Sequence, residues 1–149
     1  MGRRHRLLQT IVIAVVREDP SRREFPTRPL AYDPRIRAAV IADPFAVFFT
    51  GDSLASVTVP VQLWASEFGG DGVTERQVAA VDKTLPAVHE YHVVPNSEHF
   101  VFLIPCPRTL AEAVPEICTD APGFDRAAFH RRFNAAVLSF FHATLGDCS

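Results

Sequence analysis

Residues 59–65, VPVQLWA, form a short and nearly continuous apolar run, which is typical of a strand covered on both faces of a sheet. Outward from this run, Thr74 is placed to cap a helix over about 75–85, whose apolar side would pack on the strand. Residues 89–94, HEYHVV, predict the next strand. A strand, helix and strand in this order predict a parallel β-α-β unit, because a parallel pair needs a crossover connection.

Two further elements flank this unit. Residues 36–42, IRAAVIA, predict a strand before it that Asp43-Pro44 stops. After it, a short helix is expected over 100–104, and a long last helix is expected between Asp125 as its cap and Gly146 as its end. The last helix has apolar residues at helical spacing: Phe129, Phe133, Ala136, Val137, Phe140 and Phe141. The predicted class is α/β, with a short parallel sheet and flanking helices. Three strands leave long exposed edges, which indicates part of a larger sheet.

Composition limits the classes of function. The chain has 149 residues, 48% of them hydrophobic, and a formal net charge of −2, as expected of one folded domain. Its basic residues are almost all arginine and form no extended patch, so we expect no nucleic-acid partner. Residues 7–16 are apolar but too few to span a membrane. They follow a basic stretch, as in a signal peptide, yet no small-residue cleavage site follows them. Localisation is undecided, with the cytoplasm as the default and export as the alternative.

Cysteine usage gives little support for a disulfide framework or a metal site. The three cysteines are Cys106, Cys118 and Cys148, an odd number with no C-x-x-C pair. We expect simple thiols. A bridge between Cys106 and Cys118 is the alternative if the protein is exported.

Ionisable residues follow the predicted strands, at the sheet edge where function collects in parallel sheets. Asp43 follows the first strand, Glu67 and Asp71 follow the second, and His99 follows the third. A carboxylate and a later histidine have the order of the acid and base of a Ser-Asp-His triad in α/β-hydrolases. His99 is therefore the candidate general base, and a carboxylate before it would orient the imidazole.

The other histidines are weaker candidates. His89 and His92 are three apart on a strand, so their side chains point to opposite faces and cannot share one metal ion. His130 and His142 lie on the last predicted helix and are expected at its surface.

From residue 33 to the end, about four fifths of the chain, the sequence resembles the C-terminal part of the dienelactone-hydrolase-like branch of the α/β-hydrolases, which is related to the platelet-activating-factor acetylhydrolases. The stretches that carry the resemblance are DPRIRAAVIADP (33–44), VTVPVQLWASE (57–67), GGDGVT (69–74), EYHVVPNSEHFVFLIPC (90–106) and PEICTDAPGFDRAAFHRRFNAAVLSFF (115–141). The resemblance implies an incomplete α/β-hydrolase fold over 33–149, preceded by an unmatched segment and connector over 1–32. It also implies small-molecule carboxylic esters or lactones as substrates, no metal or organic cofactor, and His99 as the catalytic histidine.

The acid of this triad has alternatives. The usual position in the family, in the loop after the strand that precedes the histidine, is matched by Asp71. The platelet-activating-factor acetylhydrolases carry the acid one strand earlier, and RIRAAVIAD (35–43) followed by SEF (66–68) is similar to their pattern, which nominates Asp43. Glu67 is a third candidate.

The nucleophile of the family is missing from the sequence. A Gly-x-Ser-x-Gly elbow should precede Asp33, and none is present, so a misplaced start or a frameshift is expected and the chain alone should not turn over esters. Residues 48–54 (FFTGDSL) imitate the GDSL block of another esterase class, with Ser53 as its serine. However, a strand rather than a helix is expected next, no Gly-x-Asn-Asp block follows, and position 96 is Asn rather than Asp.

A non-enzymatic reading also stays open. An incomplete sheet can bury its edges by forming a homodimer or by pairing with a partner. Apolar side chains at Phe45, Phe48 and Phe49 would favour a binding or dimerising module of this kind.

Overall fold

The computed structural model describes residues 33–49, 52–87 and 89–146. The chain divides into two units, Met1–Ile36 and Arg37–Ser149, and the second contains every helix and strand given below. The apolar run at 7–16 and Cys148 lie outside the described residues. The domain boundary expected after residue 32 stays a prediction for the same reason.

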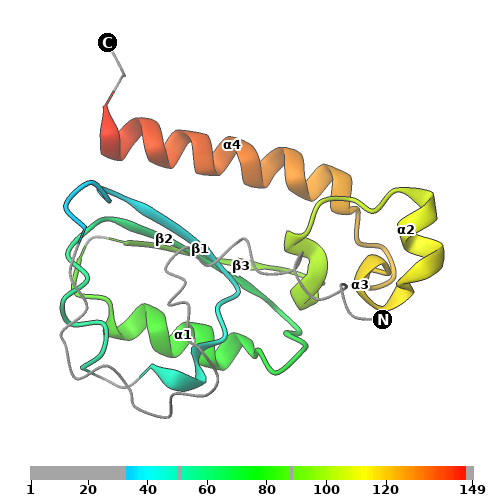
Figure 1. The fold of residues 1–149 in the computed structure, drawn as a ribbon, viewed down its shortest axis with the longest axis horizontal. Helices are drawn as coiled ribbons and strands as arrows, with labels where there is room; N and C mark the ends of the chain where they lie inside the picture. The colour runs from blue at the N-terminus through cyan, green and yellow to red at the C-terminus, as the bar shows by residue number, and fades with distance from the viewer. Residues whose placement is uncertain (1–32, 50–51, 88, 147–149) are drawn as a thin grey trace, which may run out of the picture. The chain divides into compact units, whose positions relative to one another are not determined.

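The second unit contains a three-stranded parallel sheet (Figure 1). Its strands are β1 (Ala39–Ala42), β2 (Val61–Ser66) and β3 (His89–Val94), in the spatial order β1-β2-β3. All six residues of β2 are buried, because this strand is central in the sheet and has a helix on each face. The predicted α/β class with a short parallel sheet is confirmed. The first strand is three residues shorter than predicted, since its ladder with β2 begins only at Ala39.

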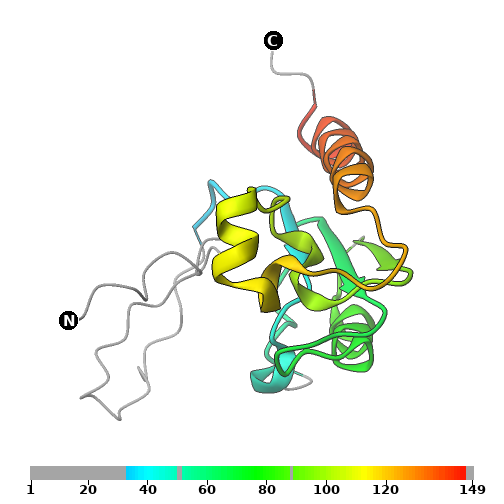
Figure 2. The same cartoon turned by 90° about the vertical axis from the view of Figure 1, so that its right-hand side faces the viewer.

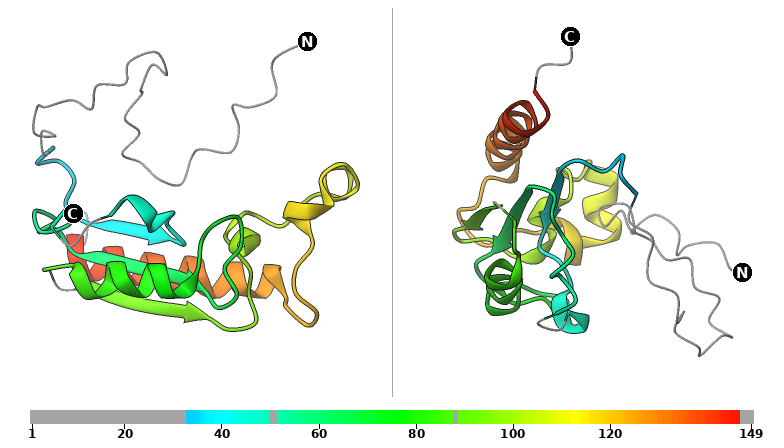
Figure 3. Two further views of the ribbon diagram at one scale, coloured as in Figure 1. Left: turned by 90° about the horizontal axis from the view of Figure 1, so that it is seen from below. Right: turned by 90° about the vertical axis from the view of Figure 1, so that its left-hand side faces the viewer.

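The two long helices cover opposite faces of the sheet (Figures 1 and 2). One face packs against α1 (Glu75–Thr84) and the other against α4 (Arg126–Leu145). The right-hand view of Figure 3 shows the same layers end-on, with the strands between the two helices. The core on the α1 side consists of Ala46, Val61, Leu63, Ala65, Val73, Val78, Val81 and Leu85. The core on the α4 side is aromatic and is built from Trp64, Val94, Val101, Phe102 and Phe129.

Both helices begin at the predicted caps. The Thr74 hydroxyl accepts a hydrogen bond from the backbone N–H of Gln77, and the Gln77 side-chain oxygen accepts one from the backbone N–H of Thr74. Together these two bonds form a complete capping box. The Asp125 carboxylate accepts from the Ala128 amide at the start of α4, and Gly146 ends that helix with a positive φ of 74°. Within the described residues, no helix is both long enough and apolar enough to cross a bilayer.

The segment between β3 and α4 differs most from the prediction. It contains a 3-10 helix, η2 (His99–Phe102), where a short helix was expected over 100–104, and two helices that were not predicted, α2 (Arg108–Ala113) and α3 (Pro115–Cys118). Neither α2 nor α3 has a buried residue, so no apolar periodicity marks them in the sequence. One further 3-10 helix, η1 (Ala46–Phe48), follows β1.

Cys106 and Cys118 form a disulfide, with their Cα atoms 5.7 Å apart, so the expectation of simple thiols is wrong for this pair. The bridge closes a loop around α2 and α3, which pack no side chain into either core. Arg126, buried in the first turn of α4, holds the far side of this loop through hydrogen bonds to the Asp120 carboxylate and the Ile117 carbonyl. This tether, the disulfide together with the hydrogen bonds of Arg126, thus holds α2 and α3 in place without a hydrophobic core.

Breaking the tether should lower stability. We expect the double variant Cys106→Ser/Cys118→Ser to lose about 3 kcal/mol in the free energy of unfolding, because the closed loop no longer restricts the unfolded chain. Urea titration followed by circular dichroism measures this loss. An unchanged midpoint in the double variant would contradict the structural role of the bridge.

Candidate functional site

Three strand ends converge at the carboxyl edge of the sheet. Asp43 follows β1 directly, Ser66 is the last residue of β2, and His99 begins η2 after the loop that leaves β3. The chain leaves β1 and β3 through left-handed residues, Asp43 with φ 48° and Asn96 with φ 54°. Asp and Asn tolerate this conformation better than other non-glycine residues. These local choices bring the three side chains together.

The carboxylate of Asp43 lies at the centre of the site. Asp43 is only 2% exposed. Its Oδ1 accepts the Ser66 backbone N–H at 3.0 Å, and its Oδ2 accepts the Ser66 hydroxyl at 2.5 Å. Oδ2 also contacts Nδ1 of His99 at 2.9 Å. A buried carboxylate is costly without hydrogen bonds, and these three partners satisfy it.

His99 is held by its backbone as well as by its ring. Its amide donates to the Gly69 carbonyl at 2.8 Å, and its ring packs edge-on against Phe100 at 5.1 Å between centroids. A Cβ on Gly70 would come within 3.4 Å of the His99 Cβ, and Gly70 has φ 131°, so glycine suits this close approach. The loop after β2 thereby fixes where His99 stands.

The contact with Asp43 assigns the protons of the imidazole. A carboxylate has no hydrogen to donate, so Nδ1 of His99 must carry the hydrogen that joins the two groups. Nε2 of the neutral ring is then a lone-pair acceptor, and in the described part of the chain no group is bonded to it. The His99 side chain remains 26% exposed. The arrangement can accept a proton at Nε2 and stabilise the imidazolium that results.

An open pocket of about 350 Å³ adjoins His99. Its walls come from the loop after β2, from η2 and from α3, and are formed by Phe68, Gly69, Gly70, Asp71, Glu98, His99, Phe100 and Glu116. The histidine thus borders a space in which a small molecule can stand.

The structure distinguishes among the three candidate acids. Asp43 contacts the His99 ring, whereas Asp71 is exposed at the pocket wall on a left-handed turn with φ 49°. Among the three candidates, Asp43 is therefore the carboxylate that contacts the His99 ring. The turn is closed by paired hydrogen bonds between Gly70 and Val73, which fix Asp71 at its tip. The Glu67 carboxylate instead accepts a hydrogen bond from the backbone N–H of Asn96 at 2.6 Å. This bond joins the loop after β2 to the loop after β3.

Ser53, the serine of the GDSL-like stretch, is exposed in the turn region that precedes β2. A strand follows it, as predicted, rather than a helix. Ser53 is not among the described residues that line the pocket beside His99. Its neighbour Gly51 lies outside the described residues.

His89 and His92 lie on opposite faces of β3, as predicted. His89 contacts Asp82 of α1 at 2.9 Å, while His92 stacks on Trp64 at 4.3 Å on the α4 side. Within the described residues, no group of three or more His, Cys, Asp or Glu side chains is arranged to hold a metal ion.

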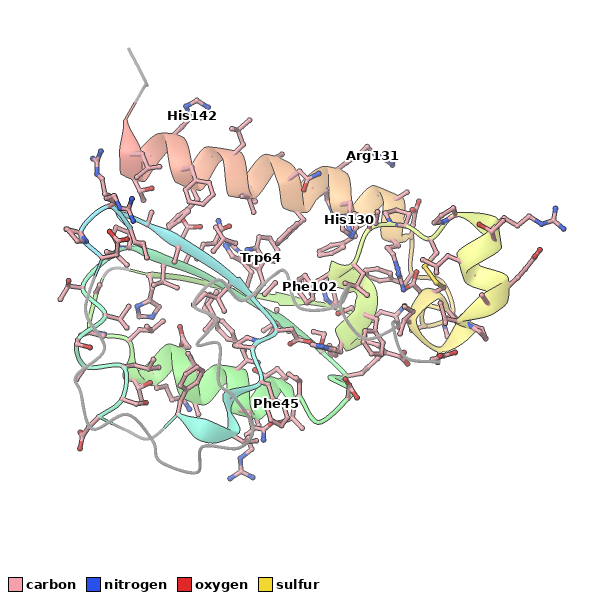
Figure 4. The ribbon with its side chains drawn as sticks, viewed as in Figure 1. Phe45, Trp64, Phe102, His130, Arg131 and His142 are labelled. Atoms are coloured by element: carbon pink, nitrogen blue, oxygen red, sulfur yellow. A yellow bond between two sulfur atoms is a disulfide. The ribbon has the colours of Figure 1, made fainter. Side chains whose placement is uncertain are left out.

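His130 and His142 differ from each other. His142 is exposed on α4, as predicted. The expectation of a surface position is wrong for His130, which is half-buried with its Nε2 2.9 Å from the Val101 carbonyl and 2.8 Å from the Leu103 carbonyl. Figure 4 shows the two histidines at different ends of α4. His130 therefore joins α4 to the segment that contains His99.

Two neighbouring groups on β3 have shifted acidities. Burial raises the pKa of Tyr91, and the hydrogen bond from its hydroxyl to Glu75 at 2.7 Å raises that pKa further. Hydrogen bonds from Gln62 and then from His92 lower the pKa of Glu90.

Ser66 belongs to the site although sequence reasoning did not single it out as a functional residue. The available signal was a small polar residue at the end of an otherwise buried strand, at the edge where the candidate acids lie. That signal alone cannot distinguish a hydrogen-bond donor to Asp43 from a residue that only ends the strand.

Comparisons with known proteins give no relative for this chain. No family model matches it, and no curated protein and no solved structure matches it.

Changing Asp43 should release the His99 ring. In Asp43→Asn we expect the Nδ1–H form of His99 to lose its dominance, because an amide can present N–H to the ring as readily as oxygen. Two-bond ¹H–¹⁵N correlation spectra of the imidazole report the tautomer directly. Asp71→Asn is the matched control and should keep the parent pattern. The opposite result, with Asp71→Asn changing the pattern and Asp43→Asn preserving it, would restore Asp71 as the partner.

Proposed function

We propose that residues 33–149 are the acid-and-base part of a serine hydrolase of the α/β-hydrolase type, acting on carboxylic esters or lactones. One observation carries the proposal. The buried Asp43 carboxylate contacts Nδ1 of His99, and His99 lines an open pocket. This is the geometry that a base needs if it is to take a proton from a serine hydroxyl.

The order of the elements supports the proposal. Asp43 follows one strand of a parallel sheet, His99 follows a later strand, and a long helix closes the chain over the sheet. In the α/β-hydrolases the acid likewise precedes the histidine in the chain. The acid lies two strands before the histidine, which favours the pattern of the platelet-activating-factor acetylhydrolases within the dienelactone-hydrolase-like branch.

The proposed chemistry is acyl transfer through a covalent intermediate. Nε2 of His99 takes the proton of the serine hydroxyl while the serine oxygen attacks the carbonyl carbon of the ester. The imidazolium then gives this proton to the leaving alcohol, and an acyl-enzyme remains. A water molecule, activated by the same Nε2, releases the acid. Asp43 stays ionised throughout and stabilises the imidazolium.

The nucleophile in this proposal comes from a segment outside these 149 residues, because the sequence contains no Gly-x-Ser-x-Gly. The amides that stabilise the tetrahedral oxyanion belong to the same missing part of the family's site. The chain alone is therefore proposed to be inactive as an esterase.

The coding DNA upstream of Met1 gives the sharpest test. We expect a Gly-x-Ser-x-Gly in one of its reading frames, and joining that frame to this chain should give hydrolysis of p-nitrophenyl butyrate. His99→Ala and Asp43→Asn should each lower kcat/KM of the joined chain by about 10³-fold or more. Asp71→Asn should stay close to the parent. Full activity in His99→Ala, or no such motif upstream, would contradict the proposal.

The present chain serves as the negative control. It should not react with a fluorophosphonate probe and should not hydrolyse the same ester. The GDSL reading expects labelling at Ser53 that Ser53→Ala removes. Labelling of this kind would transfer the nucleophile role to Ser53.

A dimerising module is the second candidate, and a specific surface favours it. Phe45, Val47 and Phe49, in and beside η1, are each about half exposed. If they form an interface, sedimentation equilibrium should show a rising mass with concentration, and Val47→Ser/Phe49→Ser should abolish the rise. A monomeric mass at every concentration would exclude this candidate.

A further inference from the structure

Ser66 holds the Asp43 carboxylate by two groups at once. We propose that Ser66 is a positioning residue, which fixes Asp43 so that His99 keeps its hydrogen on Nδ1 and its lone pair on Nε2. Its importance for catalysis rests on the proposed hydrolase function, but its effect on His99 can be measured in this chain directly.

The sheet places Ser66 at a fixed position. Ser66 ends the central strand and pairs with Val94 of β3, while the β1 ladder stops at Ala42 opposite Trp64. The residue after Ala42 is Asp43, so the side chain of Asp43 reaches the end of β2 from the neighbouring strand. Ser66 is 0% exposed, and water does not compete for its hydroxyl. The contact is therefore part of the sheet and not of a mobile loop.

The two hydrogen bonds act on different oxygens. The Ser66 backbone N–H holds Oδ1 at 3.0 Å, and the Ser66 hydroxyl holds Oδ2 at 2.5 Å. A carboxylate held at both oxygens cannot rotate about its terminal bond without breaking one of these bonds. Oδ2 has a second lone pair, and the His99 ring uses it at 2.9 Å. Without the Ser66 hydroxyl, Oδ2 would be held only by the His99 ring, which is itself the group that Asp43 orients.

Loss of the hydroxyl would affect His99 through Asp43. Oδ2 would keep a single donor in a buried site, and the carboxylate could turn to seek other partners. The imidazole would then lose the fixed acceptor that selects its Nδ1–H form. Ser66 does not touch the pocket itself, so its effect is one of position.

Ser97 provides a matched control at the same sheet edge. It is also a serine, it is also 0% exposed, and its hydroxyl also makes a short hydrogen bond, to the Val94 carbonyl at 2.7 Å. Its hydroxyl does not contact Asp43 or the His99 ring. Ser97→Ala therefore costs a buried hydrogen bond of the same kind without touching the acid–base pair.

The test is NMR of the full chain, using two-bond ¹H–¹⁵N spectra of His99 and its Nδ1–H proton resonance. The parent should show the Nδ1–H form and a proton protected from exchange with water. In Ser66→Ala we expect this pattern to move towards the tautomer mixture of a free histidine, with exchange faster by about tenfold or more. Ser66→Thr, which keeps a hydroxyl, should restore the parent pattern, and Ser97→Ala should not change it.

The outcomes separate this inference from the proposed function. An unchanged His99 pattern in Ser66→Ala, or an equal change in Ser97→Ala, would overturn the positioning role. If amide spectra show that Ser66→Ala does not fold, Ser66→Cys decides, because a thiol is a weak donor and should give the same change. Absence of esterase activity in the joined chain would overturn the hydrolase function and would leave this NMR result standing.

Discussion

A carboxylate removed from water must find its hydrogen bonds inside the protein, and Asp43 finds them on two other segments of the chain. Ser66 offers two donors from the end of β2, and His99 offers a third from the start of η2. These contacts require that the three parallel strands keep their register, because a slip of one residue would turn Asp43 or Ser66 to the other face. The geometry of the site therefore depends on the register of the sheet.

The position of His99 depends in turn on the elements around it. Its amide is bonded to Gly69, and the segment that follows it is bonded to α4 through His130. That helix is itself held on the sheet by aromatic packing of Phe129 and Phe133 against Trp64. In Figure 4, Trp64 lies between the sheet and α4, and His130 lies nearer the N-terminal end of that helix. The α4 core therefore supports the base, while the sheet edge supports the acid.

The sequence predicts those parts of the fold that repeat a pattern. The nearly continuous apolar run predicted β2, and Thr74 and Asp125 marked the starts of α1 and α4, because an apolar run and a helix cap are local signals. For the partner of His99 the sequence left Asp71, Asp43 and Glu67 as alternatives, because a sequence cannot show how far a loop carries a side chain. Asp71 is held at a turn tip, whereas Asp43 stays at the sheet. The helices α2 and α3 lacked an apolar repeat that could reveal them. The spacing of Cys106 and Cys118 alone could not establish their disulfide.

Features that cost free energy gather at the carboxyl edge of the sheet. Among the described residues, the non-glycine positions with positive φ are Asp43, Asp71 and Asn96, and all of them lie in loops that leave the carboxyl ends of strands. Such conformations cost free energy and persist where the surrounding structure enforces them. A buried carboxylate is also poor as a source of stability, since apolar residues of similar volume would serve the core as well or better. On both faces of the sheet that helices cover, the core is mostly apolar, as stability alone would favour. Strained backbone and a buried carboxylate thus lie together around His99, as the proposed function requires.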